Sequence, residues 1–101
     1  MEETMDKLKK FDLMEKICRE LEDVRNSQQA VLEKIGKIEV DNIELGDQIL
    51  ESRLPEIYQQ TADTQDVIKE VLEAFQQKTD EFGDANNVAK LREQEEINNL
   101  K

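Results

Sequence analysis

Apolar residues recur at alternating steps of three and four residues from Met14 to Ser52. The positions that share this spacing are Met14, Ile17, Leu21, Val24, Gln28, Val31, Ile35, Ile38, Asn42, Leu45, Ile49 and Ser52. A mean spacing of about 3.5 residues is the heptad repeat of a coiled coil, with Met14 at position a and Ile17 at position d. The stretch therefore predicts a long helix whose apolar stripe is covered by another helix.

Two polar residues, Gln28 and Asn42, occupy a positions of this repeat. A buried Asn at position a sets register and strand number in parallel dimers, at a cost in stability. In a parallel, in-register pair, Asn42 would meet Asn42 of the second chain, and each amide would satisfy the other. In that arrangement we expect Asn42→Val to raise thermal stability and to loosen oligomer specificity. The alternative is that both polar residues mark places where the seam loosens.

The e and g positions beside the seam bear on the strand number. In a parallel pair, Glu20 would meet Arg25 and Lys34 would meet Glu39, so opposite charges favour a parallel dimer. A further partial apolar row runs along position e, at Phe11, Cys18 and Leu32. A seam widened in this way indicates that a further helix packs along position e. Bundles of three or four helices are therefore the alternative to a two-stranded coiled coil.

Pro55 interrupts the second half of the chain. Proline lacks an N–H group and disfavours helical geometry at the preceding residue, but it is tolerated in the first turn of a helix. This predicts a long helix over about residues 4–52 and a second helix over about 55–82, ended by Gly83. The stripe of the second helix is Leu54, Tyr58, Thr61, Gln65, Ile68, Leu72, Phe75, Thr79 and Phe82. Residues 1–83 then form the coiled-coil region, and residues 84–101 form a short helix or a flexible tail.

An earlier break is the alternative to a continuous first helix. Gly36 weakens a helix by about 1 kcal/mol relative to Ala, and residues 41–44 have the spacing of a capping box. Gly46 adds a further weak point. A break in this region would give a hairpin with arms of roughly 13–39 and 42–82.

The composition supports an all-α fold. The 101 residues include 39% charged, 37% hydrophobic and 4% aromatic residues, with three Gly and one Pro. Such a chain allows one domain at most, with too little apolar material for a large compact core. The composition is typical of coiled coils and long helices. We therefore expect an elongated coiled coil or helical bundle.

The chemistry of the chain argues against an enzyme and against a cofactor or metal site. The sequence has no His, and its one cysteine, Cys18, cannot form a zinc site or a thiol-dependent catalytic arrangement without one. A net charge of −11 argues against binding nucleic acid or an anionic membrane. With one cysteine, no apolar run of membrane-spanning length and no signal-peptide pattern, we expect a cytoplasmic protein.

These features predict a structural or adaptor protein, a coiled-coil subunit that mediates oligomerisation or assembly of a cytoplasmic multi-protein complex. Its expected partners are a second copy of itself, with a parallel dimer favoured, or other helical subunits. The predicted interface residues are Met14, Ile17, Leu21, Val24, Gln28, Val31, Ile35, Ile38, Asn42, Leu45, Ile49, Ile68, Leu72, Phe75 and Phe82.

Two alternatives follow from the length and the acidity. The length, the acidity and a possible mid-chain turn resemble the small secreted helical-hairpin proteins of the bacterial WXG100 family, although the Trp-x-Gly turn of that family is missing here. The other alternative is an acidic inhibitor that binds a basic surface of a partner.

Overall fold

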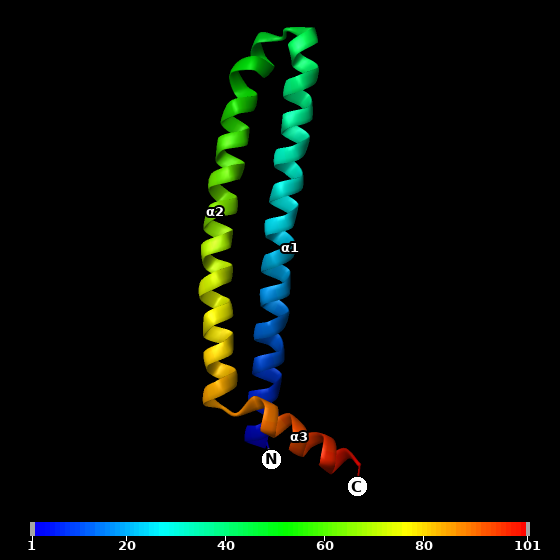
Figure 1. Cartoon of the computed structure of the whole chain (residues 1–101), viewed down its shortest axis with the longest axis vertical. Coiled ribbons are helices and arrows are strands. Elements are labelled where there is room, and N and C mark those ends of the chain that lie inside the picture. Colours follow the sequence, from blue (N-terminus) through cyan, green and yellow to red (C-terminus); the bar gives the residue numbers. More distant parts are fainter. Residues whose placement is uncertain (1, 101) are drawn as a thin grey trace. The chain divides into compact units, whose positions relative to one another are not determined.

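A computed structural model describes the backbone of residues 2–100 and the side chains of residues 6–100. The described residues form three helices and no strand: α1 (Glu2–Leu45), α2 (Gln48–Ala85) and α3 (Val88–Asn99) (Figure 1). The all-α prediction is confirmed. Within this part of the chain, none of the helices combines the length and the apolar character needed to cross a membrane.

The first helix ends earlier than predicted. The expected span of about 4–52 is wrong at its end, because α1 ends at Leu45 and the chain turns at Gly46. Gly46 has a φ of 70°, which glycine adopts without the Cβ penalty of other residues. Its N–H group donates to the carbonyl oxygen of Asn42 at 2.7 Å. The alternative of a mid-chain break is therefore closer to the structure, although Gly36 itself lies inside α1.

The second helix begins before Pro55, contrary to the prediction that it follows the proline. Asp47 caps α2, because its Oδ1 accepts a hydrogen bond from the N–H of Leu50 at 2.9 Å. Pro55 then lies inside α2, where it removes one backbone hydrogen bond of the helix. The cap and the turn thus decide the helix start, and the proline is accommodated seven residues further on.

The predicted end of the second helix at Gly83 is also wrong, since α2 continues to Ala85. The left-handed residue that follows is Asn87, with a φ of 54°, and α3 begins directly after it. Asn is one of the few non-glycine residues that adopt this conformation readily. Of the two outcomes expected for residues 84–101, the structure has the short helix.

The chain consists of two compact units. Unit 2, Leu21–Val71, is a helical hairpin in which the second part of α1 runs antiparallel to the first part of α2. Its buried side chains are Leu32, Ile35, Asn42 and Leu54. Midway along the hairpin, the Gln65 side-chain amide donates to Oε1 of Gln29 at 2.9 Å, which places these two residues at the same level.

Unit 1, Met1–Glu20 with Leu72–Lys101, joins the first part of α1, the end of α2 and α3. Its buried side chains are Leu8, Met14, Leu72, Thr79 and Val88. The Sγ atom of Cys18 lies 3.5 Å from Oγ1 of Thr79, and the Lys10 ammonium lies 5.1 Å from the centre of the Phe82 ring. These contacts join α1 to α2 within this unit.

The face of α1 that packs on α2 differs from the predicted seam. The a positions face α2, but they alternate with the e positions instead of the d positions. The buried or half-buried residues in this row are Phe11, Met14, Cys18, Leu21, Arg25, Gln28, Leu32, Ile35, Glu39 and Asn42. The predicted stripe of α2 is buried or half-buried, except that Tyr58 keeps 43% of its surface exposed.

Asn42 closes the turn between the two helices of unit 2. The Nδ2 of Asn42 donates to the carbonyl oxygen of Asp47 at 3.1 Å. In return, the backbone N–H of Asp47 donates to Oδ1 of Asn42 at 2.9 Å. Only 8% of Asn42 is exposed, so the amide is buried with its polar atoms satisfied inside one chain. This role reverses the stability change that we expect for an apolar substitution.

We expect Asn42→Ala to lower the free energy of unfolding by about 1–2 kcal/mol, because two hydrogen bonds are lost at a buried site. Asn26→Ala is the matched control, since Asn26 is exposed within α1 and the same change removes neither bond. The higher helix propensity of Ala should leave that variant slightly more stable than the wild type. Urea unfolding followed by circular dichroism measures both, and a more stable Asn42→Ala protein would contradict the assignment.

Candidate functional site

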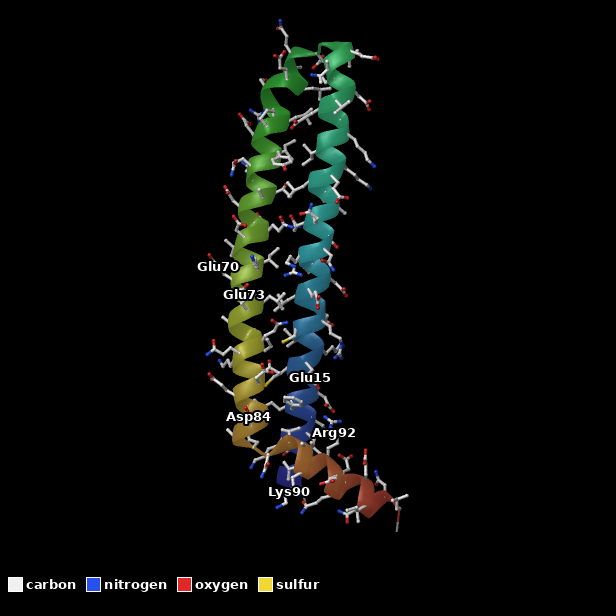
Figure 2. All side chains as sticks on the ribbon, viewed as in Figure 1. Glu15, Glu70, Glu73, Asp84, Lys90 and Arg92 are labelled. Atoms are coloured by element: carbon white, nitrogen blue, oxygen red, sulfur yellow. The ribbon has the colours of Figure 1, made fainter. Side chains whose placement is uncertain are left out.

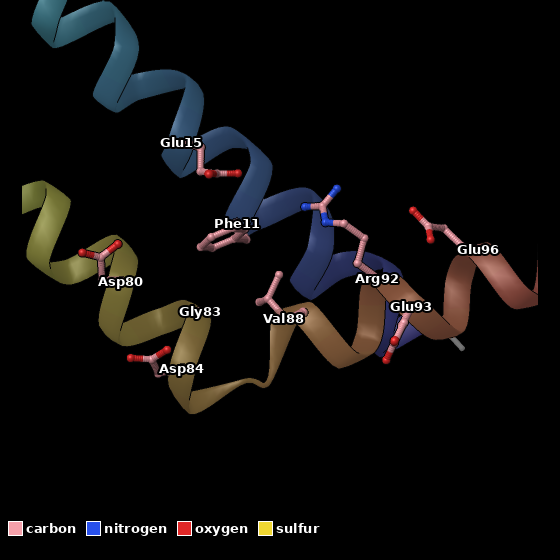
Figure 3. A pocket seen from close by; sticks show the side chains of 10 residues that line it. Phe11, Glu15, Asp80, Gly83, Asp84, Val88, Arg92, Glu93 and Glu96 are labelled. Carbon is pink, nitrogen blue, oxygen red and sulfur yellow. The ribbon is translucent and has the colours of Figure 1, made fainter.

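One candidate site is an open cavity of about 710 Å³ in unit 1, called here the acidic pocket. Its lining comes from all three helices: Phe11, Glu15, Asp80, Gly83, Asp84, Val88, Ala89, Arg92, Glu93 and Glu96 (Figure 3). Phe11 of α1 and Val88 of α3 supply apolar surface, and five carboxylates supply negative charge. The pocket therefore combines a small apolar area with an acidic rim.

Gly83 shapes this pocket by letting α2 approach α1 closely. A Cβ atom at position 83 would lie 2.9 Å from Cε2 of Phe11, a separation that real side chains do not tolerate. The Phe11 ring fills the space that a larger residue would occupy. This contact explains a glycine inside a helix, where it is otherwise unfavourable by about 1 kcal/mol.

Arg92 ties α3 to α1 beside the pocket. Both Lys90 and Arg92 belong to α3 (Figure 2), and Nη2 of Arg92 lies 2.5 Å from Oδ1 of Asp12. The hydrogen bond with Asp12 raises the pKa of the Arg92 guanidinium above its ordinary value, against a smaller opposite effect of burial. The guanidinium is therefore charged throughout the neutral range, and the buried side chain of Val88 adds an apolar anchor.

The titratable side chains in the lining of the acidic pocket are five carboxylates and the Arg92 guanidinium. The lining contains no Cys, Ser or His, so no nucleophile stands beside a base. Among the described residues, no group of three or more His, Cys, Asp or Glu could hold a metal ion. The carboxylates of the pocket attract cations electrostatically.

A second candidate is an exposed apolar surface on unit 2, called here the open face. On α1 it consists of the d residues Val24, Val31 and Ile38, each three residues after a seam residue. On α2, Ile57 and Val71 lie three residues after the seam residues Leu54 and Ile68. Three residues correspond to a rotation of about 300° around a helix axis. Because α1 and α2 run antiparallel, this rotation away from the seam places the exposed row of α1 and the exposed row of α2 on the same face of the hairpin. Val67 lies one residue before Ile68 and extends the face outward.

The level of each residue follows from the hydrogen bond between Gln29 and Gln65. Counting outward from this pair brings Val24 beside Val71 at one end of the open face. Ile38 lies beside Ile57 at the end nearer the turn, and Val31 lies between them. The apolar side chains of the two helices are thus side by side at both ends of the open face. In its middle, Val31 lies beside the exposed Thr64, which is three residues after the seam residue Thr61.

The predicted interface residues fall into two groups. The a residues of α1 that face α2 are Met14, Leu21, Gln28, Ile35 and Asn42. The predicted residues of α2 that face α1 are Ile68, Leu72, Phe75 and Phe82. The d residues Val24, Val31, Ile38 and Leu45 are exposed, as is Ile49, while Ile17 is half-buried. The structure therefore uses the a row within the chain and leaves most of the d row on the surface.

Two features of these sites were not predicted from the sequence. The pairing of Asp12 with Arg92 joins residues far apart in the chain, and no local pattern announces it. The close approach of Gly83 to Phe11 is likewise a tertiary contact. The turn at Gly46 was part of the alternative in which the first helix breaks near the middle of the chain.

Comparisons of this chain with protein families, with curated proteins and with solved structures found no match.

We expect Gly36→Ala to raise the free energy of unfolding by about 1 kcal/mol, since Gly36 is helical and nothing lies within 4 Å of the added Cβ. Gly83→Ala offers the same gain in helix propensity but drives the Cβ into the Phe11 ring. The Gly83 variant should therefore be less stable than the Gly36 variant by about 1–3 kcal/mol. Equal thermal stability of the two variants would show that α2 does not approach Phe11 this closely.

We expect Arg92→Gln to accelerate amide exchange in α3 by up to about fivefold, because exposed ion pairs contribute about 0.2–1 kcal/mol. Lys90→Gln is the matched control, since it removes the same charge from an exposed site on α3. Hydrogen exchange measured by mass spectrometry on peptides from residues 88–99 compares the two variants. Equal exchange in both would rule out an anchoring role for Arg92.

Proposed function

We propose that this protein is a non-enzymatic structural or adaptor subunit that assembles with itself or with other helical subunits of a cytoplasmic complex. The observation that carries the proposal is the open face of unit 2. The hairpin already buries one apolar row in its own seam and still presents a second row of aliphatic side chains to solvent, interrupted on α2 by Thr64. Contiguous exposed apolar surface marks interaction sites, whereas scattered apolar residues do not.

The electrostatics of the chain support a protein partner. A net charge of −11 repels nucleic acid and anionic lipid. The open face itself consists of aliphatic side chains, which an amphipathic helix can cover at positions repeated every three or four residues. Cytoplasmic assembly is part of the proposal because the chain has one cysteine and no possible disulfide partner within it.

Light scattering after size exclusion tests this proposal, with circular dichroism on the same fractions at two protein concentrations. We expect a highly helical species larger than the 11.8 kDa monomer, or a stoichiometric complex with a helical subunit when the tagged protein is purified from its own cells. A protein that remains monomeric at both concentrations and recovers no stoichiometric partner would contradict the proposed function.

A further inference from the structure

The geometry points to a specific partner for the open face. We propose that it binds the open face of a second copy of this chain, so that two unit 2 hairpins form a four-helix bundle. This inference rests on the proposed function and identifies the surface and the partner. The apolar residues of the face, Val24, Val31, Ile38, Ile57, Val67 and Val71, are between 40% and 57% exposed. Burial of half-exposed aliphatic side chains is the main favourable contribution to such an assembly.

The outer rows of the open face select the partner by charge. On α1, the residues that precede the seam residues Gln28, Ile35 and Asn42 are Ser27, Lys34 and Asp41. On α2, the residues that precede the seam residues Leu54 and Thr61 are Arg53 and Gln60. Asp41 lies twelve residues after Gln29, and Arg53 lies twelve residues before Gln65, so these two charges are at one level of the hairpin. Lys34 and Gln60 share another level. The face therefore has opposite charges at matching heights on its two edges.

A two-fold axis parallel to the helices uses this arrangement. It places α1 of each copy over α2 of the other at the same level, so that Asp41 meets Arg53 of the second copy twice. Lys34 then meets Gln60, and no like charges are opposed. The other possible two-fold axis runs perpendicular to the helices. It places α1 of one copy over α1 of the other, so that Asp41 of one copy lies far from Arg53 of the second copy. Charge complementarity thus favours a parallel arrangement of the two copies with their turns at the same end.

The opposite face of unit 2 does not offer a comparable surface. One residue after the seam positions of α1, this face has Glu22, Gln29 and Gly36, and in the same place on α2 it has Pro55, Ala62 and Lys69. The large aliphatic residues on that side are Val40 and Ile43, which both lie near the turn and are 63% and 81% exposed. Because the large aliphatic residues of the opposite face are confined to the region of the turn, a two-fold interface through the open face closes as a dimer and does not extend into a fibre.

Sedimentation equilibrium on the full chain tests the proposal with matched variants. Ile38→Glu inserts a carboxylate into the open face, and we expect it to raise the dimer Kd by about tenfold or more, because a buried unpaired charge is unfavourable. Ile43→Glu makes the same change on the opposite face and should leave the Kd within about twofold. Circular dichroism verifies that both variants keep the helicity of the wild type.

Charge reversal provides a second test, independent of any folding defect in Ile38→Glu. At low salt, Asp41→Arg and Arg53→Asp alone should each raise the dimer Kd about threefold, and the double variant should restore it. Restored affinity supports the proposed pairing, and a double variant weaker than either single one overturns it.

The outcomes separate this inference from the proposed function. A wild-type dimer weakened by Ile38→Glu but not by Ile43→Glu supports the open face as the interface. If the dimer is insensitive to Ile38→Glu, the face is wrong but self-assembly stands. If the wild type is monomeric at all concentrations, the inference is overturned, and the search for a stoichiometric helical partner then decides the proposed function.

Discussion

The reversal of the chain depends on the reciprocal hydrogen bonds between the Asn42 side chain and the backbone of Asp47. Together with the left-handed Gly46 and the Asp47 cap, they close a link of two residues between α1 and α2. A link this short forces the two helices of unit 2 to be antiparallel neighbours. Because Asn42 lies at position a, the bonds also turn the a row toward α2, where it is buried.

This use of the a row determines which apolar residues remain for another chain. A heptad stripe can be covered by a partner molecule or by the same chain, and its spacing is identical in both cases. Here the a row is covered from within, and the d row becomes the flank of the hairpin seam. The open face is thus a consequence of intramolecular pairing, since a long unpaired helix would offer both rows to its partner.

The sequence predicted the helical class and the stripe of α2, because period and composition are properties of local sequence. It did not predict which helix covers the heptad stripe. That choice depends on the hydrogen bonds between the Asn42 side chain and Asp47, which exist only when the chain turns at Gly46. The start assigned to α2 at Pro55 was wrong because the cap at Asp47 prevailed over the local preference of proline. Gly83 signalled a helix end, but its contact with Phe11 is a tertiary contact that sequence does not show. The pairing of Asp12 with Arg92 beside the acidic pocket is likewise a tertiary contact.

The most direct test of the account is whether α1 and α2 pair within one chain. Thr79→Cys places a thiol beside the native Cys18, whose Sγ lies 3.5 Å from Oγ1 of Thr79. Mild oxidation followed by mass spectrometry and a denaturing, non-reducing gel distinguishes a bond within a chain from one between chains. The account predicts an intramolecular disulfide in a single-chain species, with no cross-link in the wild type. A disulfide-linked dimer as the main product, or two thiols that stay reduced, would contradict the pairing of α1 with α2 in unit 1 and with it the intramolecular pairing of these two helices.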